Sequence, residues 1–395
     1  MSSGRSQALA SPSLVRWSRA TSGLDVAGAA KRLKVPSATV EAWESGEKRP
    51  SMAQLRRMAA VYKRPLAVFY LSEPPVDFTP LRDFRTIAGH EQTIDTPRLA
   101  FEIRRAHQRR EAALELADVN GDGPVLFRVR SRLTDEPTAV AGRLRELLAI
   151  SLDEQFAWSN QYECLNAWKG AAERVGVLVF QTESLPLEEA RGFSLAQFPL
   201  PVIALNTKDS PRGRAFTLMH ELAHIALRAG GVCDLHEIAH SNREIDRMEV
   251  FCNRVAGETL IPRASIAPSL ETLGLAHERE WLDPALHAFA ARYSVSMDAA
   301  LRSLVQAGRF PMAAYIERHA EFLELSRSAR PKAGRVPYFR RALSWAGRRF
   351  AHMALIAYDD QRISSADLTE FLHVKMKQVD QIRAALRSDE HPGSA

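Results

Sequence analysis

The pattern of apolar and polar positions divides the first 72 residues into short helices separated by helix breakers. Four helical segments are predicted, at 14–23, 24–35, 37–46 and 52–64. Asp25 and Ser37 are each expected to cap a helix, because a side-chain oxygen at a helix start accepts an unpaired backbone N–H. The apolar positions that fold these short helices onto one core are Ala30, Leu33, Val35, Val40 and Trp43.

Further along the chain the pattern becomes mixed. A long Arg-rich helix is predicted over 97–118, and amphipathic helices follow at 139–150 and 161–176. Three apolar runs bounded by breakers then predict the strands of one small sheet, at 177–183, 192–196 and 201–207. Two strong helices are expected at 212–231 and 243–262, and the rest of the chain is nearly all helical. The predicted fold class is therefore mainly α with a small β-sheet, an α+β arrangement.

Composition is that of a globular protein with two or three domains. The chain has 395 residues, of which 46% are apolar and 25% charged. No apolar run approaches the ~20 residues that a membrane-spanning helix needs, so a membrane protein is not expected. The three cysteines form no disulfide framework and the N-terminus lacks a secretory apolar stretch, so a cytoplasmic location is expected.

The positive charge is concentrated at the N-terminal end. Residues 1–72 hold twelve Lys/Arg and four Asp/Glu, a net charge of +8, whereas the whole chain carries +6 and the remainder therefore −2. A concentrated basic segment is typical of a surface that binds a polyanion such as nucleic acid. A solvated basic surface without a ligand is the alternative, and charge alone does not separate the two.

The pattern His-Glu-x-x-His occurs twice within 21 residues, at His220–His224 and at His236–His240. On a helix, residues four apart lie on one face, so the two histidines can share a cation. Zinc favours imidazole nitrogen, and a hydrolytic zinc site adds a third protein ligand and a water. The glutamate after the first histidine, Glu221 in the first copy, points toward that water and can accept its proton.

The surroundings of the two copies favour the first as the metal site. Its sequence "FTLMHELAHIAL" is apolar on both sides, so the helix is predicted to be buried, and a buried polar pair requires a partner such as a metal. Glu249 lies 25 residues after His224 on the next predicted helix, which leaves room for the chain to turn back and supply a third ligand. The second copy follows a Gly-Gly pair and precedes charged, loop-forming residues, where a ligand pair is poorly held. We interpret His236 and His240 as an exposed chance repeat, with a substrate-contacting loop at the rim of the cleft as the alternative.

Two separated motifs resemble the ImmA/IrrE family of metallopeptidases. "RAFTLMHELAHIAL" and "MEVFCNRVAGETLIP" match that family's HExxH helix and a later helix with Glu, a nearby Asn and a terminal Leu-x-Pro. The matching positions outside the HExxH are Arg214, Phe216, Glu249, Asn253, Ala256, Leu260 and Pro262. The resemblance covers about residues 135–310 and implies a zincin-like fold of the gluzincin type. It implies Zn²⁺, or Mn²⁺ as the alternative, held by His220, His224 and Glu249, with Glu221 as the general base. For Asn253 two roles stay open: a helix cap or packing contact, or a hydrogen bond to one of the metal-binding side chains.

Residues 24–60 resemble a helix-turn-helix of the XRE type, at Ala30, Leu33, Val35, Trp43, Glu44, Gly46, Pro50 and Leu55. The resemblance implies an N-terminal domain that binds duplex DNA. The candidate DNA-binding residues are Lys31, Arg32, Ser37, Thr39, Glu41, Lys48 and Arg49, of which the four basic ones are expected to meet phosphates. The outward face of the predicted recognition helix is Ser37, Ala38, Thr39, Glu41 and Ala42. This face has no Arg, Asn or Gln, the usual readers of base edges, so a helix-turn-helix used for protein contact is the alternative.

The C-terminal third shows a helix–turn–helix rhythm over 284–308 and, more loosely, over 363–386. Helical packing that completes the peptidase domain and its tail is the preferred interpretation, and a second nucleic-acid surface is the alternative. The predicted domains are a helix-turn-helix domain, a linker with a long basic helix, a metallopeptidase domain and a helical C-terminal region, at 1–72, 73–125, 126–312 and 313–395.

The two resemblances together imply a DNA-binding zinc metalloendopeptidase. The substrate they imply is a repressor or antitoxin-like protein, cleaved in a stress or phage response, and a homodimer is one assembly that fits. The alternative is an XRE-type regulator or antitoxin whose peptidase-like domain senses a ligand or partner without cleaving. The complete set of His220, Glu221, His224 and Glu249 argues against lost chemistry, although a metal kept only for stability would also explain it.

Overall fold

In the computed structural model of the chain, the described residues are 8–64, 66–73, 97–121, 123–182, 184–187, 189–228, 242–278, 281, 283–328 and 336–388. The chain divides into two compact units, one formed by residues 1–105 with 184–190 and the other by residues 106–183 with 191–395. The division falls inside the long helix α5 (Pro97–Asn120). The domain boundaries expected after residues 72, 125 and 312 remain predictions.

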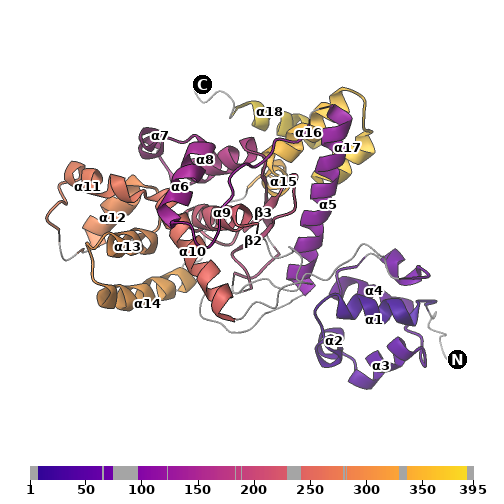
Figure 1. Cartoon of the computed structure of the whole chain (residues 1–395). Coiled ribbons are helices and arrows are strands. Elements are labelled where there is room, and N and C mark those ends of the chain that lie inside the picture. Colours follow the sequence, from indigo (N-terminus) through magenta and orange to yellow (C-terminus); the bar gives the residue numbers. More distant parts are fainter. Residues whose placement is uncertain are drawn as a thin grey trace. The chain divides into compact units, whose positions relative to one another are not determined.

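The first unit begins with a set of short helices (Figure 1). They are α1 (Pro12–Ala20), α2 (Val26–Leu33), α3 (Ser37–Ser45), α4 (Met52–Val61) and the 3₁₀ helix η1 (Leu66–Tyr70). Asp25 caps α2 as predicted, because its carboxylate accepts a hydrogen bond from the Gly28 N–H at 2.7 Å. Ser37 does not cap α3, since it is already the first helical residue and Pro36 takes the cap position without a side-chain hydrogen bond.

The core of the first unit is made of apolar side chains from these short helices. Buried members include Ala30, Leu33, Val40, Trp43, Leu55 and Met58, and Val35 packs against them partly buried. Glu44 lies beside this core with a side chain that is 5% exposed. Arg19 donates two hydrogen bonds to its carboxylate, from Nε to Oε1 at 2.6 Å and from Nη2 to Oε2 at 2.9 Å. This bidentate ion pair holds the end of α1 against α3.

The second unit contains the sheet and the remaining helices. Before the strands lie α6 (Pro137–Leu148), α7 (Leu152–Ala157) and α8 (Gln161–Arg174). After them come α9 (Pro211–Ala226), α10 (Asn242–Leu260), α11 (Arg263–Thr272), α12 (Asp283–Arg292), α13 (Met297–Gln306) and α14 (Met312–Ser328). The last elements are α15 (Tyr338–Ala346), α16 (Arg348–Asp359), α17 (Ser365–Leu372), the 3₁₀ helix η2 (Met376–Gln378) and α18 (Val379–Ser388).

The sheet has three strands, β1 (Leu178–Thr182), β2 (Gly192–Leu195) and β3 (Val202–Asn206), in the order β1-β3-β2. β1 and β3 are parallel, and β2 pairs antiparallel with β3 along one edge. Every residue of β1 and β3 is buried, which explains why both read as unbroken apolar runs. The predicted strands and the predicted fold class, mainly α with a small sheet, are confirmed.

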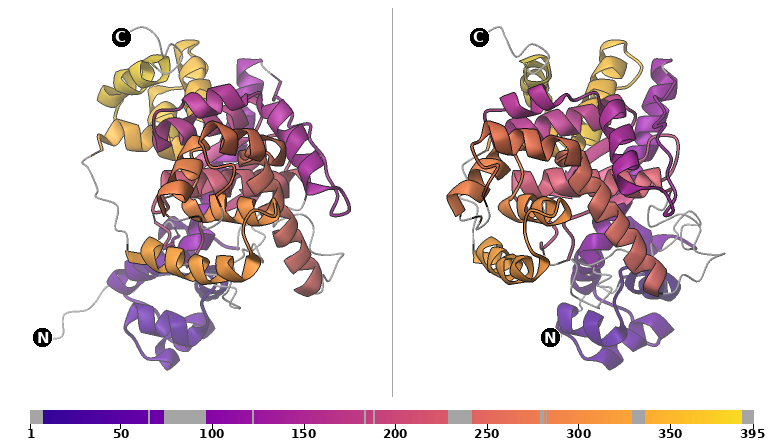
Figure 2. Two further views of the ribbon diagram at one scale, coloured as in Figure 1. Left: turned by 90° about the vertical axis from the view of Figure 1, so that its left-hand side faces the viewer. Right: turned by 60° about the vertical axis from the view of Figure 1, so that its left-hand side comes forward.

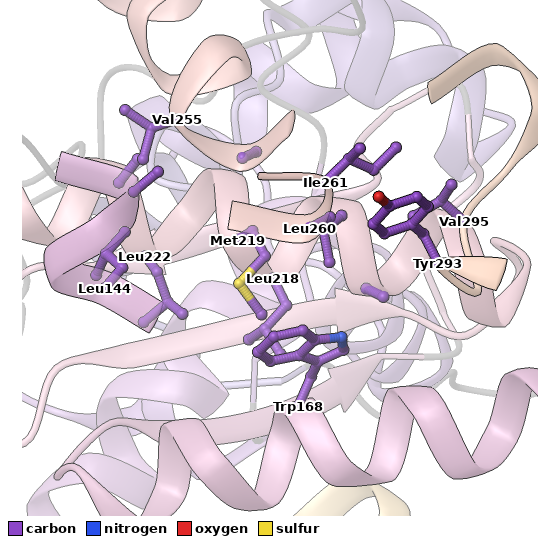
Figure 3. Packing of buried hydrophobic residues seen from close by; sticks show 14 of the residues in the cluster. Leu144, Trp168, Leu218, Met219, Leu222, Val255, Leu260, Ile261, Tyr293 and Val295 are labelled. Carbon is purple, nitrogen blue, oxygen red and sulfur yellow. The ribbon is translucent and has the colours of Figure 1, made fainter. Parts of the chain in front are cut away.

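The core of the second unit surrounds α9. Trp168 of α8, Leu218 and Leu222 of α9, and Val255 of α10 belong to one cluster of buried side chains (Figure 3). Because α9 packs against α8 and α10, apolar residues are needed on both sides of its sequence, as the "FTLMHELAHIAL" pattern has them. This packing fixes α10 beside α9 and so determines which side chains of the two helices meet.

The last helices of the second unit, α15 to α18, gather at one of its ends, coloured yellow in Figure 2. α15 packs against β1. Gly347, between α15 and α16, has a φ of +78°, and a Cβ at this position would lie 2.7 Å from the Val179 carbonyl oxygen. Only glycine therefore lets this corner approach the strand so closely. Among the described residues, no helix combines the length and the apolar content that crossing a bilayer requires.

Candidate metal centre

Helix α9 presents two histidines on one face. It begins at Pro211, and the hydroxyl of Ser210 accepts the Gly213 N–H at 3.0 Å. His220 and His224 lie one turn apart, with their ring centroids separated by 4.7 Å. Their side chains are only 15% and 10% exposed, so little water remains to solvate the ring nitrogens.

A third candidate ligand comes from α10. One carboxylate oxygen of Glu249 lies 3.2 Å from Nε2 of His220, and the other lies 3.4 Å from Nε2 of His224. The two Nε2 atoms are 3.0 Å apart. Each of the three residues thus offers one donor atom, and these atoms all lie within 4.8 Å of one another. Glu249 thus returns beside the two histidines, as its distance along the chain from His224 allows.

The donor atoms are spaced as a small divalent cation requires. A tetrahedral ion with bonds of about 2.0–2.1 Å places its ligand atoms about 3.3 Å apart. Asn253 Oδ1 lies 3.0 Å from Nδ1 of His220, and since an amide oxygen only accepts, Nδ1 carries a proton. Nε2 of His220 therefore either carries a second proton, which gives the ring a positive charge, or directs a lone pair at its neighbours, where a bound cation would supply that charge.

The electrostatics of the cluster favour that positive charge. The pKa of the Glu249 carboxyl lies well below its usual range, because hydrogen bonds from His220 and His224 outweigh the effect of burial, which alone would raise it. The pKa of His220 is raised although burial lowers it, because the hydrogen bond to Glu249 and the nearby carboxylates outweigh burial. The carboxylate thus stays ionised and attracts a proton or a metal ion to the histidines.

Glu221 lies beside this cluster without joining it. Its Oε2 accepts a hydrogen bond of 2.6 Å from the hydroxyl of Ser194. Ser194 is on the edge strand β2, opposite Ile203 of β3, and is 4% exposed. A carboxylate beside three candidate metal ligands is a candidate general base for a metal-activated water.

The structure thus brings together the predicted residues of the first HExxH copy and Glu249, whereas His236 and His240 lie outside the described residues. For Asn253, the contact with Nδ1 of His220 supports a role in orienting that candidate metal ligand.

Ser194 was not predicted. The available signal was a hydroxyl within the buried apolar run "GFSLA", but its partner is set by strand register, which the sequence does not state.

The predicted DNA-binding residues of the first unit lie mainly on its surface. Lys31 and Arg32 are exposed in the last turn of α2, Lys48 and Arg49 are exposed after α3, and on α3 Ser37 and Glu41 are exposed while Thr39 is partly buried. Ala42 was expected on the outward face of α3, and this expectation was wrong, since Ala42 is only 6% exposed. Both α1 and α2 pack on α3, so three consecutive residues, 42–44, are buried.

The arrangement of α9 and α10 beside a small sheet is typical of metallopeptidases with two histidines on one helix and an acidic ligand on the next. The short helices of the first unit are typical of helix-turn-helix proteins. Residues 172–305 match the IrrE N-terminal-like domain, and residues 13–68 match a helix-turn-helix domain. The resemblance to the ImmA/IrrE metallopeptidases with an N-terminal domain of the XRE type is therefore confirmed.

The chain is also similar to the radiation response metalloprotease IrrE of Deinococcus radiodurans. The two are 31% identical over 113 residues, which are 28% of this chain and 33% of the relative. The chain thus matches about a third of the length of this curated relative.

Proposed function

We propose that this protein is a zinc-dependent endopeptidase that its helix-turn-helix domain brings to DNA. The observation that carries the proposal is the convergence of His220, His224 and Glu249 beside Glu221. The match of residues 172–305 to the IrrE N-terminal-like domain supports the reaction class, as does the similarity to a protein described as a metalloprotease.

The proposed ligands of the ion are His220, His224 and Glu249. Two imidazoles and a carboxylate suit zinc, and Mn²⁺ is the alternative ion. When bound there, zinc supplies Lewis acidity that polarises a peptide carbonyl and lowers the pKa of water toward about 7. Asn253 fixes the tautomer of His220 and so keeps Nε2 available to the ion.

The proton transfers are assigned to Glu221. Its carboxylate accepts a proton from the attacking water and delivers it to the amine of the leaving peptide. Ser194 holds one oxygen of that carboxylate and leaves the other to take the proton. Ser194 is thus a positioning residue for the base.

The proposed substrate is a DNA-bound repressor or an antitoxin-like protein, cleaved in a stress or phage response. A protease held on DNA by its own helix-turn-helix domain meets proteins bound nearby at a high effective concentration. The match of residues 13–68 to a helix-turn-helix domain supports this placement.

The test compares wild type with Glu221→Gln on a candidate repressor substrate, with zinc supplied. Because the amide is too weak a base to take a proton, Glu221→Gln should keep its metal and its Tm and cleave about 10²–10⁴-fold more slowly. Glu271→Gln, at an exposed position on α11, is the matched control and should cleave like wild type. If zinc-loaded wild type cleaves no faster than Glu221→Gln, the proposal of a protease is wrong and a non-cleaving sensor becomes the preferred function.

A further inference from the structure

The segment formed by α17, η2 and α18 follows the order of α2, turn and α3 in the N-terminal helix-turn-helix, except that its second helix opens with the 3₁₀ turn η2 (Met376–Gln378). α2 and α17 each span eight residues. Each is capped by a side chain that accepts the N–H three residues on, Asp25 from Gly28 at 2.7 Å and Ser364 from Asp367 at 3.2 Å. Each begins directly after its cap, so the first helix of both segments has the same length and the same start.

The turns that follow also have the same conformation. Lys34 ends α2 with φ 56° and ψ 49°, and His373 ends α17 with φ 51° and ψ 43°, both left-handed. The next residue then donates a backbone hydrogen bond to the carbonyl five residues back in each turn, Val35 to Ala30 at 3.1 Å and Val374 to Thr369 at 3.2 Å. Pro36 and Lys375 follow in extended conformation, and their carbonyls accept Thr39 N–H at 2.9 Å and Gln378 N–H at 2.8 Å.

The buried positions of the two segments correspond as well. The side chains that join first and second helix are no more than 3% exposed: Leu33, Val40 and Trp43 in one segment, Leu372, Val379 and Ile382 in the other. An ion pair fixes the second helix to the helix before the motif in both cases. Glu44 of α3 pairs with Arg19 of α1, and at the equivalent position Arg383 of α18 pairs with Asp359 of α16, its Nη2 lying 2.8 Å from Oδ1. The second helix thus carries the acidic partner in the N-terminal segment and the basic partner in the C-terminal segment, but the ion pair joins equivalent helices.

We infer that residues 364–388 form a second helix-turn-helix and that it binds duplex DNA through the segment from Lys375 to Arg387. In this motif the first helix crosses the phosphate backbone and the start of the second enters the major groove. The exposed side chains of that segment are Lys375, Met376, Lys377, Asp380, Gln381, Ala384 and Arg387. This inference goes beyond the proposed proteolysis and does not depend on it.

The chemistry of this surface suits DNA. Residues 336–388 hold nine Lys/Arg and five Asp/Glu, so this part of the chain is positive although the chain outside 1–72 is not. Lys375 and Lys377 lie where the turn meets the second helix and can reach phosphates. Gln381 is exposed at the position of the buried Ala42, and its amide can pair with an adenine edge, a contact that α3 lacks. Asp380 is the opposing charge on this face, as Glu41 is on α3.

The test uses the full chain with the N-terminal surface reversed by Lys48→Glu and Arg49→Glu. Its probe is a fluorescein-labelled duplex of random sequence, and anisotropy is measured across a salt series. This protein should still bind at low salt. Adding Lys375→Glu and Lys377→Glu should lower its affinity at least about tenfold and reduce the slope of log K against log salt by about 2, since each lost phosphate contact removes about 0.9.

A control of equal charge separates this surface from overall electrostatics. Arg128→Glu with Arg130→Glu reverses two exposed charges elsewhere in the same unit and should change affinity no more than about twofold. Asp380→Lys should raise the affinity, which keeps the test informative if the lysine variant fails to fold. The inference would be overturned if the Lys375/Lys377 and the Arg128/Arg130 double variants changed the DNA affinity equally. It would also be overturned if neither the Lys375/Lys377 variant nor Asp380→Lys changed the affinity. Loss of a protein partner without any change in DNA affinity would assign the surface to protein contact instead.

Discussion

Replacing Ser194 by alanine tests how the chain positions Glu221. The hydroxyl of Ser194 donates its 2.6 Å hydrogen bond to Oε2 of Glu221 from a site that is 4% exposed. Alanine removes that donor and leaves the backbone pairing of β2 with β3 in place. Glu221 then loses the contact that orients its carboxylate, while the three proposed metal ligands keep theirs.

The size of the effect follows from the kind of bond that is lost. A hydrogen bond to a charged group contributes about 1.5–3 kcal/mol. Each 1.36 kcal/mol of lost transition-state stabilisation slows a reaction about tenfold. Ser194→Ala should therefore lower kcat for cleavage of the proposed repressor substrate roughly 10- to 100-fold, with KM nearly unchanged because the hydroxyl contacts the proposed base rather than the substrate.

The assay is steady-state proteolysis combined with elemental analysis of the same samples. Ser194→Thr keeps a hydroxyl and should recover most of the activity, and both variants should hold as much metal as wild type. An unchanged kcat in Ser194→Ala would refute the positioning role. Loss of metal together with activity would also refute it, because the residue would then support the metal cluster and not the base.

Three further predictions concern the metal, the DNA contact and the stability of the first unit. Elemental analysis should find no stoichiometric metal after alanine replacement of His220, His224 or Glu249, and normal metal after replacement of His236 or His240; metal loss in the last two would overturn the assignment. Charge reversal at Arg32 and Arg49 in the full chain should weaken binding to all duplex sequences about equally and flatten its salt dependence, and an unchanged gel shift would remove the proposed phosphate contacts. Glu44→Ala leaves Arg19 without its buried partner and should lower the free energy of unfolding of the first unit by about 3–5 kcal/mol, measured by denaturant titration; a change under about 1 kcal/mol would show that the pair is solvated.

The sequence was sufficient to predict those features that depend on the residue pattern within one helix or strand. The strands read as apolar runs because both faces of β1 and β3 are covered. The spacing of His220 and His224 places them on one face of α9, and the distance along the chain to Glu249 is long enough for α10 to return beside α9. The cap at Asp25 was also predictable, because it depends on residues three positions apart.

The remaining features depend on how separate elements pack. Ser194 reaches Glu221 only because β2 pairs antiparallel with β3 at a particular register. Ala42 is buried because two helices cover α3, which its local spacing does not reveal. The likeness of α17 and α18 to α2 and α3 was visible only as a loose rhythm, since it is carried by a left-handed residue, a cap and a few buried positions and not by shared side chains.

Promoter activity in cells that carry Glu221→Gln decides whether the protein regulates by proteolysis. The protein is produced at the wild-type level, and the intact repressor and the output of its promoter are measured together after the inducing stress. Because the variant keeps its fold and its proposed metal ligands but lacks the base, the repressor should stay intact and the promoter silent, whereas wild type should remove the repressor and open the promoter. Normal derepression by Glu221→Gln would contradict proteolysis as the mechanism and leave a regulator that acts by binding alone.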